Sequence, residues 1–346
     1  MGIDGNCLKH PRSGVARYLE GVLSCLPALA GEAGVTFSVL APRRARRTVA
    51  WVLWHMQRIP AGEFDVLHYP FYYPCLWPQC PSTVAIHDVL VIEHPEWFPR
   101  PWVTAMRGLV RRGCQRAAAI VTASEEVASA IHSLCGVPRE RIVVVKYGVD
   151  SETFFPQDST ATDAVRQRFG LLRPFLLQVG PFEPRRAVDL SIRALTAVRD
   201  ELGDVELVLV GDTRHGVTRS EPLPAFVRRL GRVSNSELAS LYGAAGALLA
   251  PSYGEGFDLP VLEALACGGV VVASDIPVHV EHYNGAVELF VRGDANSLAE
   301  ACIRVLTDDS RIAALRSGGP RHAARFTWQE CTRRHIELWQ QVGPSS

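Results

Sequence analysis

The most constraining feature of the sequence is a repeated alternation of short apolar segments with longer segments of helical pattern. The short runs are rich in β-branched residues, which predicts strands. The longer ones carry apolar residues three or four positions apart, which predicts amphipathic helices. In residues 1–150 the predicted strands are 35–41, 65–68, 83–87, 119–123 and 142–146, and the predicted helices are 15–29, 102–116 and 125–134. Such an alternation predicts a parallel sheet covered on both faces.

The same pattern restarts in the second half of the chain. Predicted elements follow at 175–179, 187–199, 206–210, 226–230, 236–244, 247–250, 260–266 and 270–273, with later helices near 296–306 and 328–342. The sequence therefore predicts an α/β protein of two doubly wound domains. Ligands of such sheets bind at the carboxyl ends of the strands, so we expect the site in the cleft between the domains.

The polar segment 150–173 between the two series contains Pro156 and Gly170, which predicts a linker. We expect an N-terminal domain over 1–155, a second domain over 156–325, and a final helix over 326–346 that crosses back to the first domain. Only residues 1–4 remain of a first strand, which indicates either a start that is slightly late or a weak edge of the first sheet.

Composition excludes several classes of function. The chain of 346 residues is 47% hydrophobic and 21% charged, which is typical of a soluble globular protein. Its net charge of zero gives no signal for nucleic acid. The nine cysteines include no pair with the two-residue gap of a zinc or redox motif, so we expect reduced thiols. No apolar run reaches the ~20 residues that span a bilayer, and we expect a cytoplasmic protein without a signal peptide.

The charge is unevenly distributed, since residues 1–150 hold 16 basic and 12 acidic side chains. Four arginines at positions 43, 44, 46 and 47 precede Trp51 and Trp54. Such a mixture could contact an anionic membrane peripherally or bind a lipid diphosphate. The alternative is a solvated charge run beside a core helix.

The segment 252–268 follows an apolar strand and contains the most informative residues. Glycines at 254 and 256 permit a tight turn, and Pro260 suits the first turn of a helix. The free N–H groups at that helix start suit a diphosphate. Glu255 in the loop and Glu263 in the helix could accept hydrogen bonds from sugar hydroxyls, or they could be two solvated glutamates.

This segment resembles the Glu-x7-Glu motif of the family-4 glycosyltransferases, group 1 type, which have the GT-B fold. The resemblance implies that Glu255 contacts the donor sugar and that Glu263 contacts the ribose of the nucleotide. It also brings the backbone of Gly256, Phe257, Asp258 and Leu259 to the donor. The usual motif has glycine where this chain has Asp258, so Asp258 could alter the choice of sugar or could be a harmless variant.

A second segment, 179–189, lies between a predicted strand and a predicted helix. Its adjacent Arg185 and Arg186 could neutralise a diphosphate and the charge that develops on its departure. The segment is similar to the Gly-x-x-Glu-Pro-Arg-Lys-Asn pattern of the same family, in which the lysine holds the β-phosphate. Arg186 stands at that lysine and Ala187 at the asparagine. Only Lys9 and Lys146 are lysines, which favours codon bias over lost function.

Three further positions complete the predicted site. His87 ends an apolar strand and is followed by His-Pro-Glu-Trp-Phe at 94–98, a family pattern in which this histidine lines the active site. By the same resemblance, the glycine loop before a long helix faces the donor phosphate and the acceptor, which places Gly14 at the site; the alternative is a plain glycine turn. The loop at 231–238 resembles the one whose backbone meets the nucleotide base, which nominates Val233.

The resemblance implies a retaining enzyme that moves a hexose from a nucleotide diphosphate sugar to a hydroxyl of a glycan, lipid-linked or small-molecule acceptor in polysaccharide or glycoconjugate biosynthesis. GDP-mannose is the first expectation for the donor. The two arginines and the helix starts would stabilise the leaving group, so no metal and no cofactor are expected. The alternatives are a non-catalytic sugar-nucleotide-binding subunit and an enzyme of the same fold with other chemistry, such as a nucleotide-sugar epimerase.

Overall fold

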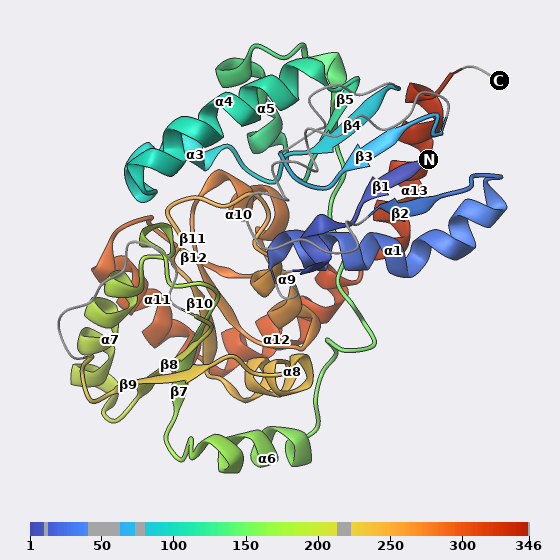
Figure 1. The fold of residues 1–346 in the computed structure, drawn as a ribbon. Coiled ribbons are helices and arrows are strands. Elements are labelled where there is room, and N and C mark those ends of the chain that lie inside the picture. Colours follow the sequence, from blue (N-terminus) through green and yellow to red (C-terminus); the bar gives the residue numbers. More distant parts are fainter. Residues whose placement is uncertain (10–12, 41–62, 73–79, 213–222, 345–346) are drawn as a thin grey trace. The chain divides into compact units, whose positions relative to one another are not determined.

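The computed structural model describes residues 1–9, 13–40, 63–72, 80–212 and 223–344. The chain divides into two compact units. The first comprises residues 1–95, 100–148 and 326–346, and the second comprises 96–99 and 149–325. Each unit contains one six-stranded sheet in which the paired strands are parallel (Figure 1). The predicted α/β class with two doubly wound domains is therefore confirmed.

The first sheet has the strand order β2-β1-β3-β4-β5-β6. Its strands are β1 (Gly2–Asp4), β2 (Ser38–Leu40), β3 (Leu67–Tyr69), β4 (Ser82–Ala85), β5 (Ala119–Thr122) and β6 (Ile142–Val144). The expected weakness of the first strand is wrong, because β1 lies between β2 and β3 and pairs with both. All three of its residues are buried, so it is an interior strand of this sheet.

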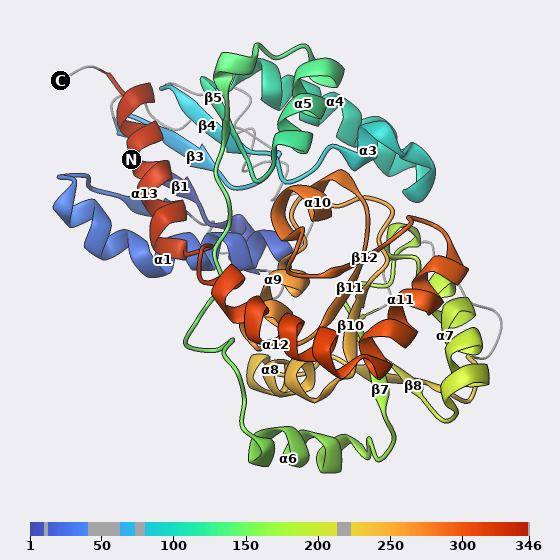
Figure 2. The same cartoon turned by 180° about the vertical axis from the view of Figure 1, so that it is seen from behind.

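Helices α1 (Gly14–Glu32), α3 (Leu90–Glu93), α4 (Arg100–Arg116), α5 (Glu125–Cys135) and α13 (Trp328–Val342) complete the first unit. The last of these, α13, packs along α1 (Figure 2). Its first residue, Trp328, lies against two glycines. A methyl group on Gly21 or on Gly148 would come within 2.2 Å of Trp328 atoms. Glycine at both positions therefore permits the close approach that joins the end of the chain to this unit.

The second sheet has the order β12-β11-β10-β7-β8-β9. Its strands are β7 (Phe175–Val179), β8 (Glu206–Val210), β9 (Val227–Gly231), β10 (Ala247–Ala250), β11 (Val271–Ser274) and β12 (Glu288–Phe290). The first three strands run outward in one direction from β7, and the next three run outward in the other direction from β10. The strand order thus reverses between β7 and β10, and ligands of doubly wound sheets bind beside such a switch point.

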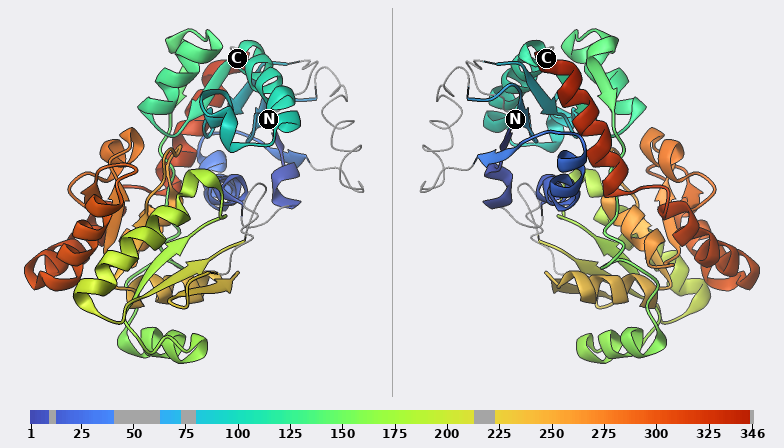
Figure 3. Two further views of the ribbon diagram at one scale, coloured as in Figure 1. Left: turned by 90° about the vertical axis from the view of Figure 1, so that its left-hand side faces the viewer. Right: turned by 90° about the vertical axis from the view of Figure 1, so that its right-hand side faces the viewer.

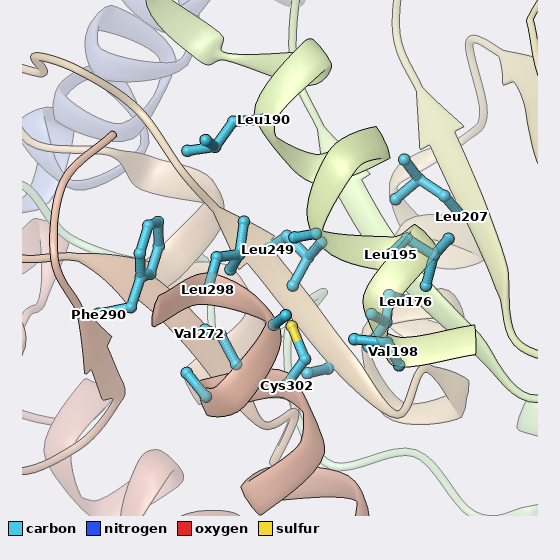
Figure 4. Packing of buried hydrophobic residues seen from close by; sticks show 14 of the residues in the cluster. Leu176, Leu190, Leu195, Val198, Leu207, Leu249, Val272, Phe290, Leu298 and Cys302 are labelled. Carbon is cyan, nitrogen blue, oxygen red and sulfur yellow. The ribbon is translucent and has the colours of Figure 1, made fainter. Parts of the chain in front are cut away.

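The second sheet is buried on both faces. Leu176, Leu249 and Val272 pack with side chains of α7 (Val188–Leu202) and α11 (Ala295–Thr307) in the core drawn in Figure 4. Their strand neighbours Leu177 and Leu248 point to the opposite face and are also buried. The remaining helices of this unit are α6 (Ser159–Phe169), α8 (Asn235–Ala244), α9 (Leu259–Ala266), α10 (Pro277–Tyr283) and α12 (Asp309–Ala323), and Figures 1 and 3 show helices on both sides of the sheet.

The prediction of a linker over residues 150–173 is wrong, because α6 occupies its second half. Asp158 caps this helix by accepting a hydrogen bond of 2.8 Å from the Ala161 N–H. Gly170 ends the helix in the left-handed conformation, with φ of 61°. The polar and glycine residues that indicated a linker are therefore helix caps.

Among the described residues no helix is both long enough and apolar enough to cross a membrane.

Candidate functional site

Two loops of the second unit meet at the switch point of its sheet. One follows β7 and carries Arg185 and Arg186, and the other follows β10 and carries Glu255 and Asp258. The two strands are hydrogen-bonded neighbours in the sheet. Because parallel strands end at the same edge, the predicted arginines and the predicted carboxylates are brought together there.

The loop after β7 is held in an unusual backbone conformation. Gly180 has φ of 133°, a region that is open essentially to glycine. Residues Pro184–Arg186 form one turn of 3-10 helix, which ends at Ala187 with φ of 47°. The Arg186 carbonyl accepts a hydrogen bond of 2.7 Å from the Gln178 side chain. These constraints fix both arginines directly before α7.

The loop after β10 also contains a residue in the left-handed conformation, as Ala187 is in the loop after β7. This residue is Asp258, with φ of 65°. Glycine adopts this conformation without strain, which explains why the resembling motif has glycine here. The Tyr283 hydroxyl donates a hydrogen bond of 2.9 Å to the carbonyl of Phe257. Pro260 lies in the first turn of α9, as its position in the sequence predicts.

The side chains of the two loops form an arginine–carboxylate cluster, which consists of Glu183, Arg185, Arg186, Glu255 and Asp258. Arg185 Nη1 pairs with Glu255 Oε2, and its Nε lies 3.0 Å from Glu183 Oε2. Arg186 Nε lies 3.1 Å from Glu255 Oε1, and Arg186 Nη1 lies 2.8 Å from Asp258 Oδ1. The Ser252 hydroxyl also donates to Glu255 Oε1 at 2.8 Å.

Because the cluster is largely buried, the charged forms of its side chains are stabilised by the opposite charges beside them. The exposed fraction of the side chain is 15% for Arg185 and 10% for Arg186, but 5% for Glu255 and 0% for Asp258. Burial alone would raise the pKa of Asp258, but the charge of Arg186 and the hydrogen bond from His279 hold that pKa well below its usual range. Burial opposes the charged form of Arg186 as well, but Asp258 and Glu255 raise its pKa.

The other nominated residues of the second unit lie around these loops. Gly256 is half-buried, whereas Phe257 and Leu259 are buried. Glu263 is buried in α9, where it accepts a hydrogen bond of 3.1 Å from the Tyr242 hydroxyl. Val233 is half-buried in the loop before α8, next to the Ser234 cap of that helix.

In the first unit, His87 follows β4 and uses both of its ring nitrogens. Nε2 lies 2.7 Å from the carbonyl oxygen of Pro70, which can only accept, so Nε2 carries the proton. Nδ1 therefore accepts from the Tyr147 hydroxyl. Burial lowers the pKa of His87 to about 4. Gly14 begins α1 directly after the Ser13 cap, and a methyl group added to it would meet no atom within 4 Å.

Sequence reasoning missed a buried chain of hydrogen bonds in the first unit. Its members are Trp339, Thr83, His68, Tyr18 and His335. Trp339 Nε1 can only donate, and the Cys331 carbonyl at the other end, 2.7 Å from His335 Nδ1, can only accept. These two ends fix the direction of every hydrogen bond between them. Thr83 donates to His68 Nδ1, His68 Nε2 donates to the Tyr18 hydroxyl, and that hydroxyl donates to His335 Nε2. Each histidine therefore carries one ring proton and is neutral. The isolated histidines gave no sequence signal for this contact between distant segments.

This chain of hydrogen bonds predicts a loss of stability in mild acid. Burial lowers the pKa of His335 to about 4 and that of His68 well below its usual range, whereas unfolded histidine titrates near ~6.5. Between these values the unfolded chain binds more protons than the folded one, so the free energy of unfolding falls as the pH falls. We expect His335 to account for a loss of roughly 2 kcal/mol between pH 7 and pH 5, and His68 to add to it in the same direction.

Urea unfolding at both pH values measures this loss. A His335→Phe variant should show a pH dependence that is weaker by about one proton. An unchanged free energy of unfolding in the wild type would contradict the assignment of neutral histidines.

Comparisons with known proteins agree with this architecture. Residues 13–153 match the model of glycosyltransferase family 4, and residues 173–308 match that of the glycosyl transferases group 1. The O-antigen chain mannosyltransferase B of Escherichia coli is 28% identical over 88% of this chain and 79% of its own length. A D-inositol 3-phosphate glycosyltransferase of Xylanimonas cellulosilytica is 32% identical over 65% of this chain, which spans only 57% of that enzyme.

A solved structure has the same fold. The crystal structure of Anabaena HepE in complex with UDP and glucose superposes with a TM-score of 0.75 at 17% identity, over 99% of both chains.

Proposed function

Because the chain belongs to the group 1 glycosyltransferases with the GT-B fold, and so to the hexosyltransferases, we propose that it moves a hexose from a nucleotide diphosphate sugar to a hydroxyl group. The proposed reaction retains the configuration of the anomeric carbon. The observation that carries this proposal is the arginine–carboxylate cluster at the switch point of the second sheet, since two adjacent guanidinium groups suit a diphosphate.

In the proposed mechanism, Arg185 and Arg186 bind the diphosphate and stabilise the charge that develops on it as the glycosidic bond breaks. Without donor, Glu255 occupies both arginines as an internal anion. A donor phosphate would replace Glu255 on Arg185, because phosphate accepts two parallel N–H groups of a guanidinium. The released carboxylate would then accept a hydrogen bond from the donor sugar.

We assign the neighbouring residues by the same proposal. Glu263 would bind the ribose, Val233 would meet the base, and the backbone of residues 256–259 would approach the sugar. His87 would line the site as a neutral imidazole. Because its two nitrogens are bonded to Pro70 and Tyr147, a hydrogen bond to the sugar would have to replace one of these contacts. Two arginines supply the positive charge at the leaving group, and we expect chelators to leave the rate unchanged.

The donor that we favour is GDP-mannose, because one relative is named a mannosyltransferase. A panel of GDP and UDP sugars should give release of one nucleoside diphosphate in the presence of acceptor hydroxyls, and the anomeric proton signal of the product would report retention. Binding and turnover of none of these donors would refute the proposal. Nucleotide binding without turnover would indicate a binding subunit, and conversion of the donor without transfer would indicate an epimerase.

We further propose a glycan or lipid-linked acceptor and peripheral contact with an anionic membrane. The arginines at 43–47 and the tryptophans that suggested this contact lie outside the described residues. Helix α4 supports it independently, because it carries arginines at 100, 107, 111, 112 and 116 and no acidic residue. Co-sedimentation with phosphatidylglycerol but not with phosphatidylcholine vesicles is expected, and equal binding to both would contradict this contact.

A further inference from the structure

Asp258 is the residue at which this chain departs from the motif that it resembles, and its carboxylate is fully engaged inside the protein. Oδ1 binds Arg186 Nη1 at 2.8 Å, and Oδ2 lies 3.2 Å from His279 Nε2. None of the side chain is exposed. The carboxylate therefore presents no surface to a donor sugar, although its place in the motif suggests such a contact.

His279 connects Asp258 to the neighbouring strand. It lies in α10, its side chain is fully buried, and its Nδ1 lies 2.9 Å from the carbonyl oxygen of Ser274 at the end of β11. The Ser274 hydroxyl donates to the carbonyl of Ser252, in the loop that carries Glu255. Arg186 thus contacts one carboxylate oxygen of Asp258, and His279 of α10 contacts the other.

Arg186 is correspondingly fixed at two of its three guanidinium nitrogens. Its Nε faces Glu255 and its Nη1 faces Asp258, while the guanidinium group lies against Gly180, where an added methyl carbon would be 3.5 Å from Cζ. No hydrogen bond of Nη2 is seen within the described ranges. Nη2 is therefore the nitrogen of Arg186 that is left for a ligand.

We propose that Asp258, held by His279, is a positioning residue that fixes the Arg186 guanidinium so that its Nη2 meets the leaving phosphate. The inference rests on the proposed function of the same site. The cluster contains two arginines and three carboxylates, so Asp258 makes it less attractive to an anion. We therefore infer that Asp258 contributes by orienting the Arg186 guanidinium. A correct orientation stabilises the transition state more than it strengthens ground-state binding.

The positioning role predicts that the Asp258→Gly substitution lowers kcat without weakening nucleotide binding. Glycine adopts the left-handed conformation freely, so the loop should keep its backbone while Arg186 loses its anchor. We expect kcat to fall about tenfold, and the Kd of the nucleoside diphosphate to change less than about threefold or to become tighter. Asp258→Asn keeps an acceptor for Arg186 and should restore part of the rate.

Glu288→Gln serves as the control, because it removes charge from another carboxylate that pairs with two arginines, Arg304 and Arg311, outside the site. Its kcat should equal that of the wild type. A wild-type kcat in Asp258→Gly, or an equal loss in Glu288→Gln, would overturn the positioning role. Loss of kcat and of nucleotide affinity in the same proportion would overturn it as well.

A measurement without substrate separates this inference from the proposed function. The Nε–H group of Arg186, identified in 15N spectra by its absence from an Arg186→Lys variant, should exchange with solvent at least about tenfold faster in Asp258→Gly than in the wild type. Equal exchange overturns the positioning role even if the enzyme is active. Absence of turnover in the wild type refutes the proposed function, and the exchange rates still decide the role of Asp258.

Discussion

Replacing Glu255 by glutamine should lower kcat by about a hundredfold while nucleoside diphosphates bind at least as tightly as before. Glutamine keeps the shape of the side chain and an acceptor for the Ser252 hydroxyl. It removes the negative charge that occupies Arg185 and Arg186 in the donor-free protein. The phosphate therefore loses a competitor, whereas the donor sugar loses the carboxylate that is proposed to bind it.

Steady-state kinetics with the preferred donor and calorimetric titration with its nucleoside diphosphate measure the two effects. Glu206→Gln is a matched control, because Glu206 is also a buried carboxylate near two arginines of the second unit. Its kcat should be unchanged. Weaker nucleotide binding by Glu255→Gln at a wild-type kcat would refute the competition between Glu255 and phosphate.

Replacing Arg186 by leucine should destabilise the second unit by about 3–5 kcal/mol. The substitution leaves Asp258, whose side chain has no exposed surface, without its guanidinium partner, and Arg185 becomes the one remaining arginine of the cluster that pairs with Glu255. The double variant Arg186→Leu with Asp258→Gly removes the buried charge as well. It should therefore be more stable than Arg186→Leu alone by at least ~2 kcal/mol.

Urea unfolding of the wild type, both single variants and the double variant gives the coupling energy. The Asp258→Gly single variant controls for the change of backbone freedom at position 258. A double variant that is no more stable than Arg186→Leu would show that these two charges do not stabilise each other.

The architecture could be predicted because strands and helices of a doubly wound sheet have local periodic signals. Local signals do not predict an element whose formation depends on its packing against distant segments. Helix α12 contains Gly318, Gly319 and Pro320, and the sequence did not predict it. A methyl group on Gly319 would lie 3.0 Å from the carbonyl oxygen of Leu265, so glycine permits the close packing of α12 on α9 that stabilises it. Helix α10 and strand β12 were not predicted either.

The site was predictable in its residue types and less so in its contacts. Glu255 and the two arginines were nominated from two loops and Glu263 from the helix that follows, and the structure brings Glu255 into contact with both arginines. The pairing of Arg186 with Asp258 joins residues 72 positions apart, and no local pattern specifies it. The acidic residue at a glycine position was its only signal in the sequence, and His279 had none. The functional roles of these residues stay predictions.

A crystal structure with the bound nucleoside diphosphate tests the central claim most directly. The account predicts phosphate oxygens within hydrogen-bonding distance of Arg185 and of Arg186 Nη2, Glu255 released from Arg185, and the contact between Arg186 and Asp258 unchanged. A diphosphate bound away from both arginines, with the Arg185–Glu255 pair intact, would contradict it.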